Sequence, residues 1–227
     1  MGRTFWDKEI VANYNPKGQY FYCPEAIRPE IYYAPKWSPA PSTTIQLVTI
    51  TQAGILKGNE IILRTAKILK EQFGFDFKWN VAGNAEAFRV AEKKTRIKHY
   101  NYNISLLGMI DADTVANMLK KSDVYIHPAI IDNSPNSLCE AQVIGCPVIA
   151  ANVGGIASLV DDGRTGILYP YNEPHMLAFK IMKLSTENYI AKKLSENEIN
   201  IATERHKPET VYKYLFEAYN SILGQKK

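Results

Sequence analysis

Between residues 45 and 151 the chain alternates between short β-branched apolar runs and longer stretches with apolar residues at helical spacing. The first strand-like run is Ile45–Ile50, which polar and turn residues bound on both sides. The next segment starts at Asn59, a residue that can cap a helix, and stops at Gly74, which suits a left-handed helix end. The same order repeats and predicts further strands at 76–82, 104–107, 123–127 and 147–151, and further helices at 85–98, 111–120 and 136–145.

Strands and helices that alternate through short loops form right-handed βαβ crossovers. The pattern therefore predicts an α/β fold, in which a doubly wound, mainly parallel, Rossmann-like sheet carries helices on both faces. Ligands of such folds bind at the carboxyl ends of the strands, where the crossover direction reverses. From Glu173 onward the composition is mostly helical, a last helix is expected over 209–223, and no further strand is apparent.

The first 44 residues differ from this ordered part. They are rich in tyrosine and proline, and prolines at that density oppose long helices, so we expect an irregular arm that packs through its rings. A packed connector is the simplest role for the arm, and a binding role is the alternative. The chain is therefore divided into the arm 1–44, a Rossmann-like domain 45–184 and C-terminal helices 185–227.

Composition excludes several classes of protein. With 227 residues, 46% of them hydrophobic, the chain can bury one sizeable core. Its 27 basic and 23 acidic residues give a net charge of +4, too small an excess to indicate nucleic-acid binding. Cys23, Cys139 and Cys146 lack the paired spacing of a disulfide framework or a zinc site, which suits a reducing cytoplasm. No apolar run reaches the roughly 18 residues of a transmembrane helix, and no secretory signal is apparent.

The most informative segment for chemistry is Ile131–Gln142, between the fourth and fifth predicted strands. Ser134 followed by Pro135 predicts the cap and the first residue of a helix. The backbone N–H groups of residues 136–138 then point out of the helix start, where the helix dipole is positive. Such a helix start is suited to bind a phosphate.

Two carboxylates bracket this anion site. Asp132 lies just before the helix start, and Glu140 lies about one turn inside it, roughly 6 Å further along the axis. Because carboxylates repel a phosphate, these two are suited to accept hydrogen bonds from sugar hydroxyls. The alternative is that both residues simply favour a helix N-terminus.

No motif indicates another phosphate-binding or catalytic class. The absence of Gly-x-Gly-x-x-Gly after any strand disfavours a nicotinamide dehydrogenase, and the absence of a P-loop disfavours a phosphotransferase of that type. No nucleophilic triad is visible. His127 ends a predicted strand, where a lone histidine is more often structural than a catalytic base.

The run 122–170 resembles the donor-binding domain of retaining glycosyltransferases of family 4, which have the GT-B fold. Members carry two glutamates separated by seven residues, then Gly-x-Pro-Val, a Val-Gly-Gly loop and an Asp-Gly-x-x-Gly turn. The corresponding segments here are Asp132 to Glu140, Gly145–Val148, Val153–Gly155 and Asp162–Gly166. Several motifs in order are much more specific than a single glycine pattern. The resemblance implies that the chain is the C-terminal half of a GT-B fold.

The resemblance also implies a role for each matching residue. Glu140 would bind the nucleotide ribose, and Asp132 would accept hydrogen bonds from the hexose. The N–H groups near Asn136, Ser137 and Leu138 would hold the diphosphate, and the side chains of Asn136 and Ser137 could add donors. Asp132 replaces the usual first glutamate, so its carboxylate has a shorter reach.

A second phosphate element is expected after the first strand, where the family shows Gly-Arg and, further on, Lys-Gly. Here Lys57 and Gly58 match the Lys-Gly pair, while Gln52 replaces the arginine. Lys57 can neutralise charge on a departing diphosphate. Gln52 lacks a permanent charge, so diphosphate binding is weaker or the charge comes from another residue. The alternative is that Lys57 is a solvated residue ahead of a helix.

Two further segments resemble the floor of the family's nucleotide cleft. Gly83 belongs to an Ala-Gly turn after the second strand and is more easily explained as a tight turn than as a ligand contact. Met109 and Ile110 follow the third strand, where the family's backbone faces the base, so only backbone contacts are implied.

Together these features predict the donor-binding domain of a retaining glycosyltransferase, which moves a hexose from UDP-hexose or GDP-hexose to a glycan or lipid-linked acceptor. Retention of configuration, the absence of a permanently bound cofactor and the absence of an essential metal follow from the resemblance alone. Lys57 and Asp132 are the candidate catalytic residues. Two alternatives remain open: a sugar-nucleotide epimerase of the same fold and a nucleotide-sugar-binding module without catalysis.

A GT-B enzyme has two such domains, and 227 residues accommodate only the second. We therefore expect a fragment that is inactive without its N-terminal acceptor domain. The last helix would cross to that domain, so Tyr212, Phe216 and Tyr219 are expected to be exposed in its absence. The expected location is the cytoplasm, with the parent protein either free or peripheral at the membrane.

Overall fold

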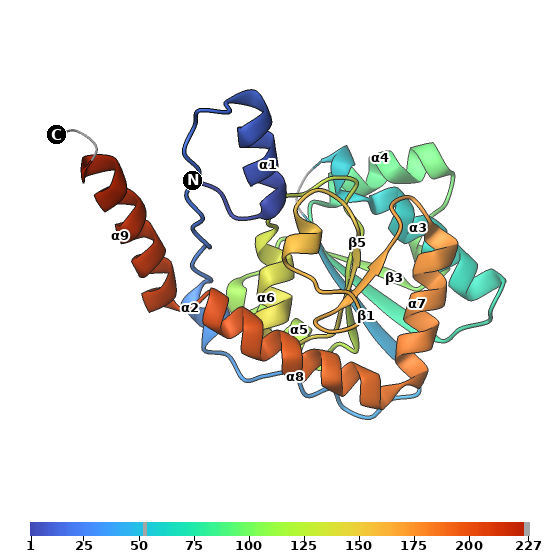
Figure 1. Cartoon of the computed structure of the whole chain (residues 1–227). Helices are drawn as coiled ribbons and strands as arrows, with labels where there is room; N and C mark the ends of the chain where they lie inside the picture. The colour runs from blue at the N-terminus through green and yellow to red at the C-terminus, as the bar shows by residue number, and fades with distance from the viewer. Residues whose placement is uncertain (52–53, 225–227) are drawn as a thin grey trace.

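The computed structural model describes residues 1–51 and 54–224, and in this part of the chain six strands form one parallel sheet (Figure 1). Its strands are β1 (Ile45–Thr51), β2 (Phe77–Gly83), β3 (Ile104–Gly108), β4 (Val124–His127), β5 (Val148–Ala151) and β6 (Ile167–Tyr169). Their order across the sheet is β3-β2-β1-β4-β5-β6, and every neighbouring pair is parallel. The predicted doubly wound, Rossmann-like α/β fold is therefore confirmed.

Helices cover both faces of the sheet, as Figure 1 shows. The longer ones are α1 (Phe5–Tyr14), α3 (Asn59–Glu71), α4 (Ala85–Thr95), α5 (Ala112–Lys121), α6 (Asn136–Ile144), α7 (Pro174–Thr186), α8 (Asn188–Arg205) and α9 (Pro208–Gly224). The short ones are α2 (Pro29–Tyr32), η1 (Ile55–Lys57), η2 (His99–Tyr102) and η3 (Ile156–Ser158). One apolar core lies between the sheet and α3, α4 and α7, and the other between the sheet and α2, α5 and α6.

Alternate residues of the central strands supply the two cores. Leu47 of β1 faces the first core, and its neighbour Val48 faces the second. In β4, Ile126 and Tyr125 divide in the same way, because successive side chains of a strand point to opposite faces. The strands are short and buried on both faces, which explains why they read as continuous apolar runs.

The crossover direction reverses between β1 and β4. From β1 the chain moves outward to β2 and β3, then returns to β4 on the other side of β1 and continues to β5 and β6. The carboxyl ends of β1 and β4 therefore flank the position where a ligand of this architecture binds. Lys57 follows one of these strands, and Asp132 follows the other.

Three details of the predicted elements differ from the structure. The arm contains a ten-residue helix, α1, because the prolines begin only at Pro16 and because Thr4 and Asp7 form a capping box at the helix start. The sheet also has a sixth strand, β6, whose three residues are too few to show a strand pattern. Asn59 is the first residue of α3 rather than its cap, which is Gly58.

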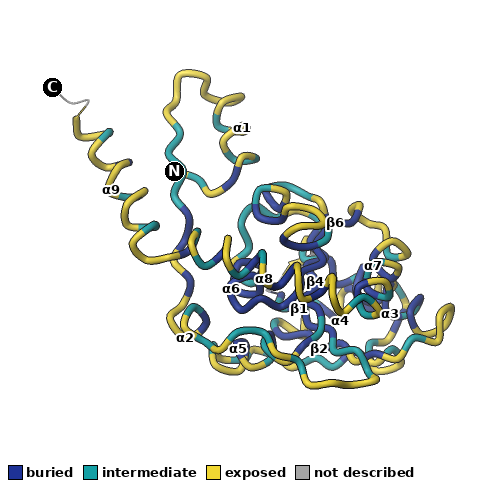
Figure 2. Tube along the Cα trace, turned by 60° about the horizontal axis from the view of Figure 1, so that its bottom comes forward, coloured by how far each residue is buried: buried dark blue, intermediate teal, exposed yellow. Residues whose placement is uncertain are grey.

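The last helix, α9, projects from the body of the domain (Figures 1 and 2). Ala218 is its one buried residue within the part of the helix that the structure describes. Tyr212, Phe216 and Tyr219 are 65%, 53% and 52% exposed, so the expected exposure of these rings is confirmed. Among the described residues, no helix combines the length and the apolarity that a membrane crossing requires.

Glu198 of α8 carries a carboxyl group inside the fold. It is fully buried, and neither of its oxygens has a hydrogen-bond partner in the described part of the chain. Burial raises the pKa of Glu198 well above its ordinary value of 4.5. The folded state therefore keeps the proton that the unfolded chain releases, so the native protein loses stability as the pH rises above about 4.5.

We expect Glu198→Leu to raise the free energy of unfolding at pH 7 by about 1 to 4 kcal/mol, because it removes an unpaired polar group from the core. Glu198→Gln removes only the ionisation, so its gain over the native protein should grow between pH 4 and pH 7. Urea denaturation of the three proteins across that pH range measures both effects. A native protein that matches Glu198→Leu in stability at pH 7 would show that the buried carboxyl costs nothing.

Candidate functional site

A cavity of about 520 Å³ opens at the carboxyl ends of β1, β2 and β4, beside the reversal of the crossover direction. Its lining includes eight of the residues that the sequence singled out, namely Lys57, Gly83, Met109, Ile110, Asp132, Asn136, Ser137 and Glu140. Gly58 and Leu138 are not part of the lining, and Gln52 lies outside the described residues. The structure thus brings most of the predicted site residues together from four separate loops.

The start of α6 presents free backbone donors to this cavity. Asn136 is the first helical residue, as the predicted range 136–145 has it, but the N-cap is Pro135 and not Ser134, whose hydroxyl instead donates to Glu25 at 3.0 Å. The backbone N–H groups of Asn136 and Ser137 make no hydrogen bond to another described residue, and no side chain caps this helix. Leu138 is fully buried, and its N–H bonds to the carbonyl of Pro135 at 3.1 Å. Residues 136 and 137 can therefore hold an anion, whereas Leu138 cannot.

Asp132 lies within an ion pair on the other side of the cavity. Its Oδ2 accepts from Nζ of Lys57 at 2.7 Å and lies 3.4 Å from Nε2 of His127. Burial alone would raise the pKa of Asp132, but the interactions with His127 and Lys57 outweigh it and lower the pKa to about 2. The two candidate catalytic residues are therefore partners of each other, and Lys57 is not a solvated side chain.

His127 is a site residue that the sequence analysis set aside as structural. Its ring is almost fully buried and lines the cavity, and Nε2 makes no hydrogen bond among the described residues. Its Nδ1 lies 3.4 Å from the hydroxyl of Tyr125, which in turn donates to Ser137 at 2.9 Å. Its position at the end of a central strand was the signal that could have identified it.

Glu140 is buried on the second turn of α6 and pairs with Arg28 of the arm. The Nε atom of Arg28 donates to Oε1 of Glu140 at 2.8 Å. Burial raises the pKa of Glu140, and the nearby guanidinium partly counteracts this effect. Arg28 also lines the cavity, so the arm supplies a cation that the sequence analysis did not anticipate. No local pattern marks Arg28, because its partner is 112 residues away.

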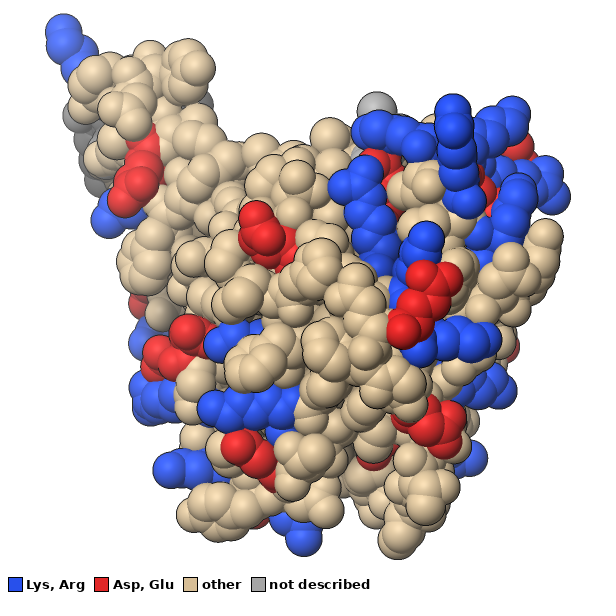
Figure 3. Space-filling model, turned by 90° about the vertical axis from the view of Figure 1, so that its right-hand side faces the viewer, with Lys and Arg blue, Asp and Glu red and all other residues tan. Residues whose placement is uncertain are grey.

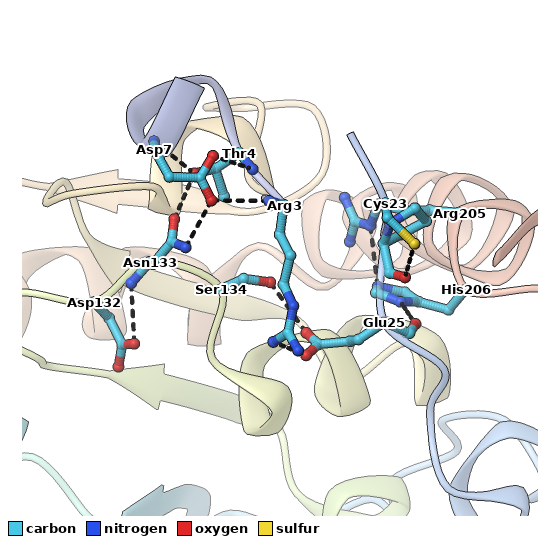
Figure 4. Close-up of polar contacts among 11 residues, drawn as sticks. Arg3, Thr4, Asp7, Cys23, Glu25, Asp132, Asn133, Ser134, Arg205 and His206 are labelled. Carbon is cyan, nitrogen blue, oxygen red and sulfur yellow. Dashed lines mark hydrogen bonds and ion pairs between the residues drawn. The ribbon is translucent and has the colours of Figure 1, made fainter. Parts of the chain in front are cut away.

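Polar contacts tie the arm to the loop that carries Asp132 (Figure 4). Both side-chain atoms of Asn133 are occupied, since Oδ1 accepts from the hydroxyl of Thr4 and Nδ2 donates to Asp7 at 2.9 Å. Glu25 accepts from Ser134 and is paired with Arg3. These contacts hold the start of α1 against the loop, although α1 buries none of its own residues.

Glu25 also accepts a hydrogen bond from the side chain of Asn136, a residue predicted to bind the ligand. With its nitrogen turned toward Glu25, the side chain of Asn136 donates to that carboxylate at 2.5 Å. The backbone of Glu25 is held in turn by Nδ1 of His206 at 2.8 Å. Because burial lowers the pKa of His206 to about 4, its ring is neutral at pH 7 and donates this hydrogen bond. Asn136 therefore offers the cavity its backbone N–H rather than its side chain.

The Val-Gly-Gly loop closes on the backbone of Asp132. The N–H of Gly155 donates to the carbonyl of Asp132 at 2.9 Å. Gly154 has φ of +50°, and a Cβ atom there would lie 2.1 Å from the same carbonyl oxygen. The loop can approach this closely because it has no side chain at that position, so a residue larger than glycine does not fit at 154.

The ion pair at Asp132 should contribute stability that depends on pH. Because the pKa of Asp132 is about 2 in the folded state and 3.8 ordinarily, the pair stabilises the fold above pH 4 and loses this contribution as the pH falls toward 2. We expect Lys57→Met to be less stable than the native protein at pH 6, with a smaller difference at pH 2.5. Urea midpoints at the two pH values measure this change, and a difference that is equal at both would contradict it.

Comparison with known proteins places this geometry in a family. The family model described as glycosyl transferases group 1 matches residues 35–201. The colanic acid biosynthesis glycosyltransferase WcaL of Escherichia coli, a putative assignment, is 26% identical over 161 residues, which are 67% of this chain and 39% of that protein. The chain thus spans well under half the length of this relative.

Two solved structures show the same fold at low sequence identity. Sucrose-phosphate synthase from Thermosynechococcus elongatus superposes with a TM-score of 0.82 at 18% identity, over 99% of this chain and 58% of that one. Anabaena HepE in complex with UDP and glucose gives a TM-score of 0.76 at 16% identity, over 97% of this chain and 62% of that one. Both are glycosyltransferase structures of the GT-B type. The chain belongs to the glycosyl transferases group 1 family and has the fold of a C-terminal GT-B domain.

Proposed function

We propose that the chain is the donor-binding domain of a glycosyltransferase that takes its hexose from a nucleoside diphosphate sugar. The observation that carries this proposal is the composition of one cavity. It combines free N–H groups at the start of α6 and the cation of Lys57 with two carboxylates, Asp132 and Glu140. Such a cavity matches an anionic diphosphate joined to two hydroxyl-rich rings.

In this proposal the diphosphate binds at the N–H groups of Asn136 and Ser137, and Lys57 turns from Asp132 toward the phosphate. Glu140 accepts hydrogen bonds from the ribose, and Asp132, freed from Lys57, accepts them from the hexose. The bond between the anomeric carbon and the diphosphate oxygen breaks while the oxygen of the acceptor hydroxyl bonds to that carbon, and the proton of that hydroxyl passes to the departing diphosphate. Charge on the leaving diphosphate is stabilised by the helix start, Lys57 and Arg28, so the chemistry is electrostatic.

The names of relatives support a sugar donor and a polysaccharide acceptor. WcaL is described as a colanic acid biosynthesis glycosyltransferase, and the solved HepE structure holds UDP and glucose. We extend these properties to this chain as part of the proposal, together with transfer with retention of configuration and without an essential metal. The acceptor domain of the whole enzyme would lie across the cavity from α6.

Calorimetric titration with UDP, GDP, UDP-glucose and GDP-mannose tests the proposal. We expect one nucleoside diphosphate to bind saturably with one site per chain, and Lys57→Ala to weaken that binding. Asp132→Asn should weaken the hexose conjugate more than the free diphosphate, because only the conjugate reaches that carboxylate. If none of the four compounds binds, or if the variants bind as well as the native chain does, this assignment of the cavity is wrong.

A further inference from the structure

The net charge of the chain is concentrated in ten residues, Arg89–Lys98, at α4 and the turn that follows it. Five of the 27 basic residues and one of the 23 acidic residues lie in this segment, so the remaining 22 of each sign balance. The single acidic residue, Glu92, is buried. The excess of positive charge thus comes from this segment, and Figure 3 shows Lys and Arg side chains gathered on the side of the molecule that carries α3 and α4.

The five cations lie exposed on this face. The side chains of Arg89, Lys94 and Lys98 remain 70%, 67% and 50% exposed although each contacts a glutamate. Lys93 and Arg96 are also exposed, and neither has an ion-pair partner in the described part of the chain. Arg89 and Lys93 are four residues apart on one helix face, where like charges repel and destabilise the helix.

Besides the repulsion between Arg89 and Lys93, the backbone conformation of Arg96 also lowers the stability of this segment. It ends α4 in the left-handed conformation, with φ of +59° and ψ of +22°, a position at which glycine or asparagine is usual. A residue with a Cβ atom is strained there. The chain therefore keeps an unpaired guanidinium at a position where glycine would be more stable, which indicates that the charge has a use.

Apolar groups accompany the cations. Val90 is 49% exposed between Arg89 and the lysines of α4, and Tyr100 just beyond the segment is 68% exposed. Leu56 of η1, which packs against α4, is 50% exposed. Basic residues interspersed with aliphatic and aromatic groups suit the boundary between anionic headgroups and acyl chains. Single-stranded nucleic acids instead bind along grooves with several stacked rings, whereas Tyr100 is the one aromatic residue classed as exposed among the described residues 88–102.

We propose that Arg89–Lys98, with Val90 and Tyr100, is a docking surface for an anionic lipid membrane. The inference does not depend on the nucleotide, because none of these residues lines the cavity. The mouth of the cavity lies beside the surface, since Gly83 lines the cavity and α4 begins two residues later. A lipid surface bound at α4 therefore lies next to the site.

Sedimentation with phosphatidylcholine vesicles, with and without phosphatidylglycerol, tests the surface directly. We expect the chain to bind only the anionic vesicles and to be released by salt. Lys93→Gln/Arg96→Gln should lower the partition coefficient about thirtyfold, or about fivefold for each cation removed. The matched control is Lys192→Gln/Lys193→Gln, which removes two exposed charges from α8 and should leave binding almost unchanged.

Arg96→Gly separates lipid binding from folding. It should raise the melting temperature, because glycine relieves the left-handed strain, and yet weaken vesicle binding about fivefold. No binding to anionic vesicles, or equal loss in the control variant, would overturn the proposal. Single-stranded RNA that binds more tightly than the vesicles and displaces them would overturn the choice of a lipid partner.

Discussion

Replacing Gly58 by alanine is expected to lower the free energy of unfolding by about 3 to 5 kcal/mol. Gly58 has φ of +76°, and a Cβ atom there would lie 1.8 Å from the carbonyl oxygen of Pro128. Gly58 and Pro128 belong to two loops, at the carboxyl ends of β1 and β4, whose backbones lie against each other here. A hydrogen bond from the N–H of Ile130 to the carbonyl of Leu56, at 2.8 Å, also joins these two loops. The substitution must therefore separate the loops that carry Lys57 and Asp132.

Gly163→Ala is the matched control for this prediction. Gly163 also has φ of +76°, but a Cβ atom there would meet nothing within 4 Å. It should cost only the left-handed strain, about 1 kcal/mol. Urea denaturation of both variants measures the two losses of stability. Their difference is the part that comes from the collision of the Cβ atom with Pro128 rather than from the left-handed backbone. Equal losses of stability would mean that the two loops can part without cost.

Replacing Glu140 by glutamine is expected to weaken binding of the nucleoside diphosphate about a hundredfold, if the cavity binds a donor as proposed. Glutamine has nearly the shape of glutamate but lacks the charge and one acceptor, and hydrogen bonds to a charged group contribute about 1.5 to 3 kcal/mol each. The substitution removes the buried charge of Glu140 and leaves only the guanidinium of Arg28 without its partner. Because Arg28 is about half exposed, water can solvate that guanidinium, so the fold should stay nearly intact. Calorimetric titration with the diphosphate identified for the native chain measures the loss.

Glu217→Gln is the control for Glu140→Gln, since Glu217 is an exposed residue of α9 outside the cavity. Binding should also weaken in the native protein as the pH falls through the raised pKa of Glu140, because the protonated carboxyl loses an acceptor site. Glu140→Gln should not show this pH dependence. If Glu140→Gln bound the diphosphate as tightly as the native chain does, Glu140 would not be a binding residue. The proposed roles of Lys57 and Asp132 would not be affected by that result.

The sequence predicted most of the sheet because its central strands are short apolar runs, each followed by a helix with a regular apolar stripe. It did not reveal β6, since Ile167–Tyr169 has too few residues to show a period. It also did not reveal α1, because the proline-rich composition of the arm is an average and the first fifteen residues contain no proline. Composition describes a segment as a whole, whereas a capping box acts at one position.

The candidate site was predictable in part for a topological reason. Lys57, Asp132 and the start of α6 all follow β1 or β4, and parallel strands bring their carboxyl ends to the same edge. The pairing of Lys57 with Asp132 was not predicted, because each residue was assigned its own part of a ligand. The contributions of Arg28, Glu25 and Asn133 depend on contacts between residues more than 100 positions apart, for which no sequence spacing exists.

The attachment of α1 has a thermodynamic consequence. This helix buries no residue of its own, and the hydrogen bonds of Thr4 and Asp7 to Asn133 hold its start against the loop that carries Asp132. Water can replace such bonds at a cost of about 1 kcal/mol each, far less than unfolding the core requires. A ligand that orders the loop of Asp132 therefore favours the state in which α1 is attached. Because such coupling is reciprocal, a partner that binds attached α1 would change the affinity of the cavity for its ligand by the same factor by which that ligand changes the affinity of α1 for the partner.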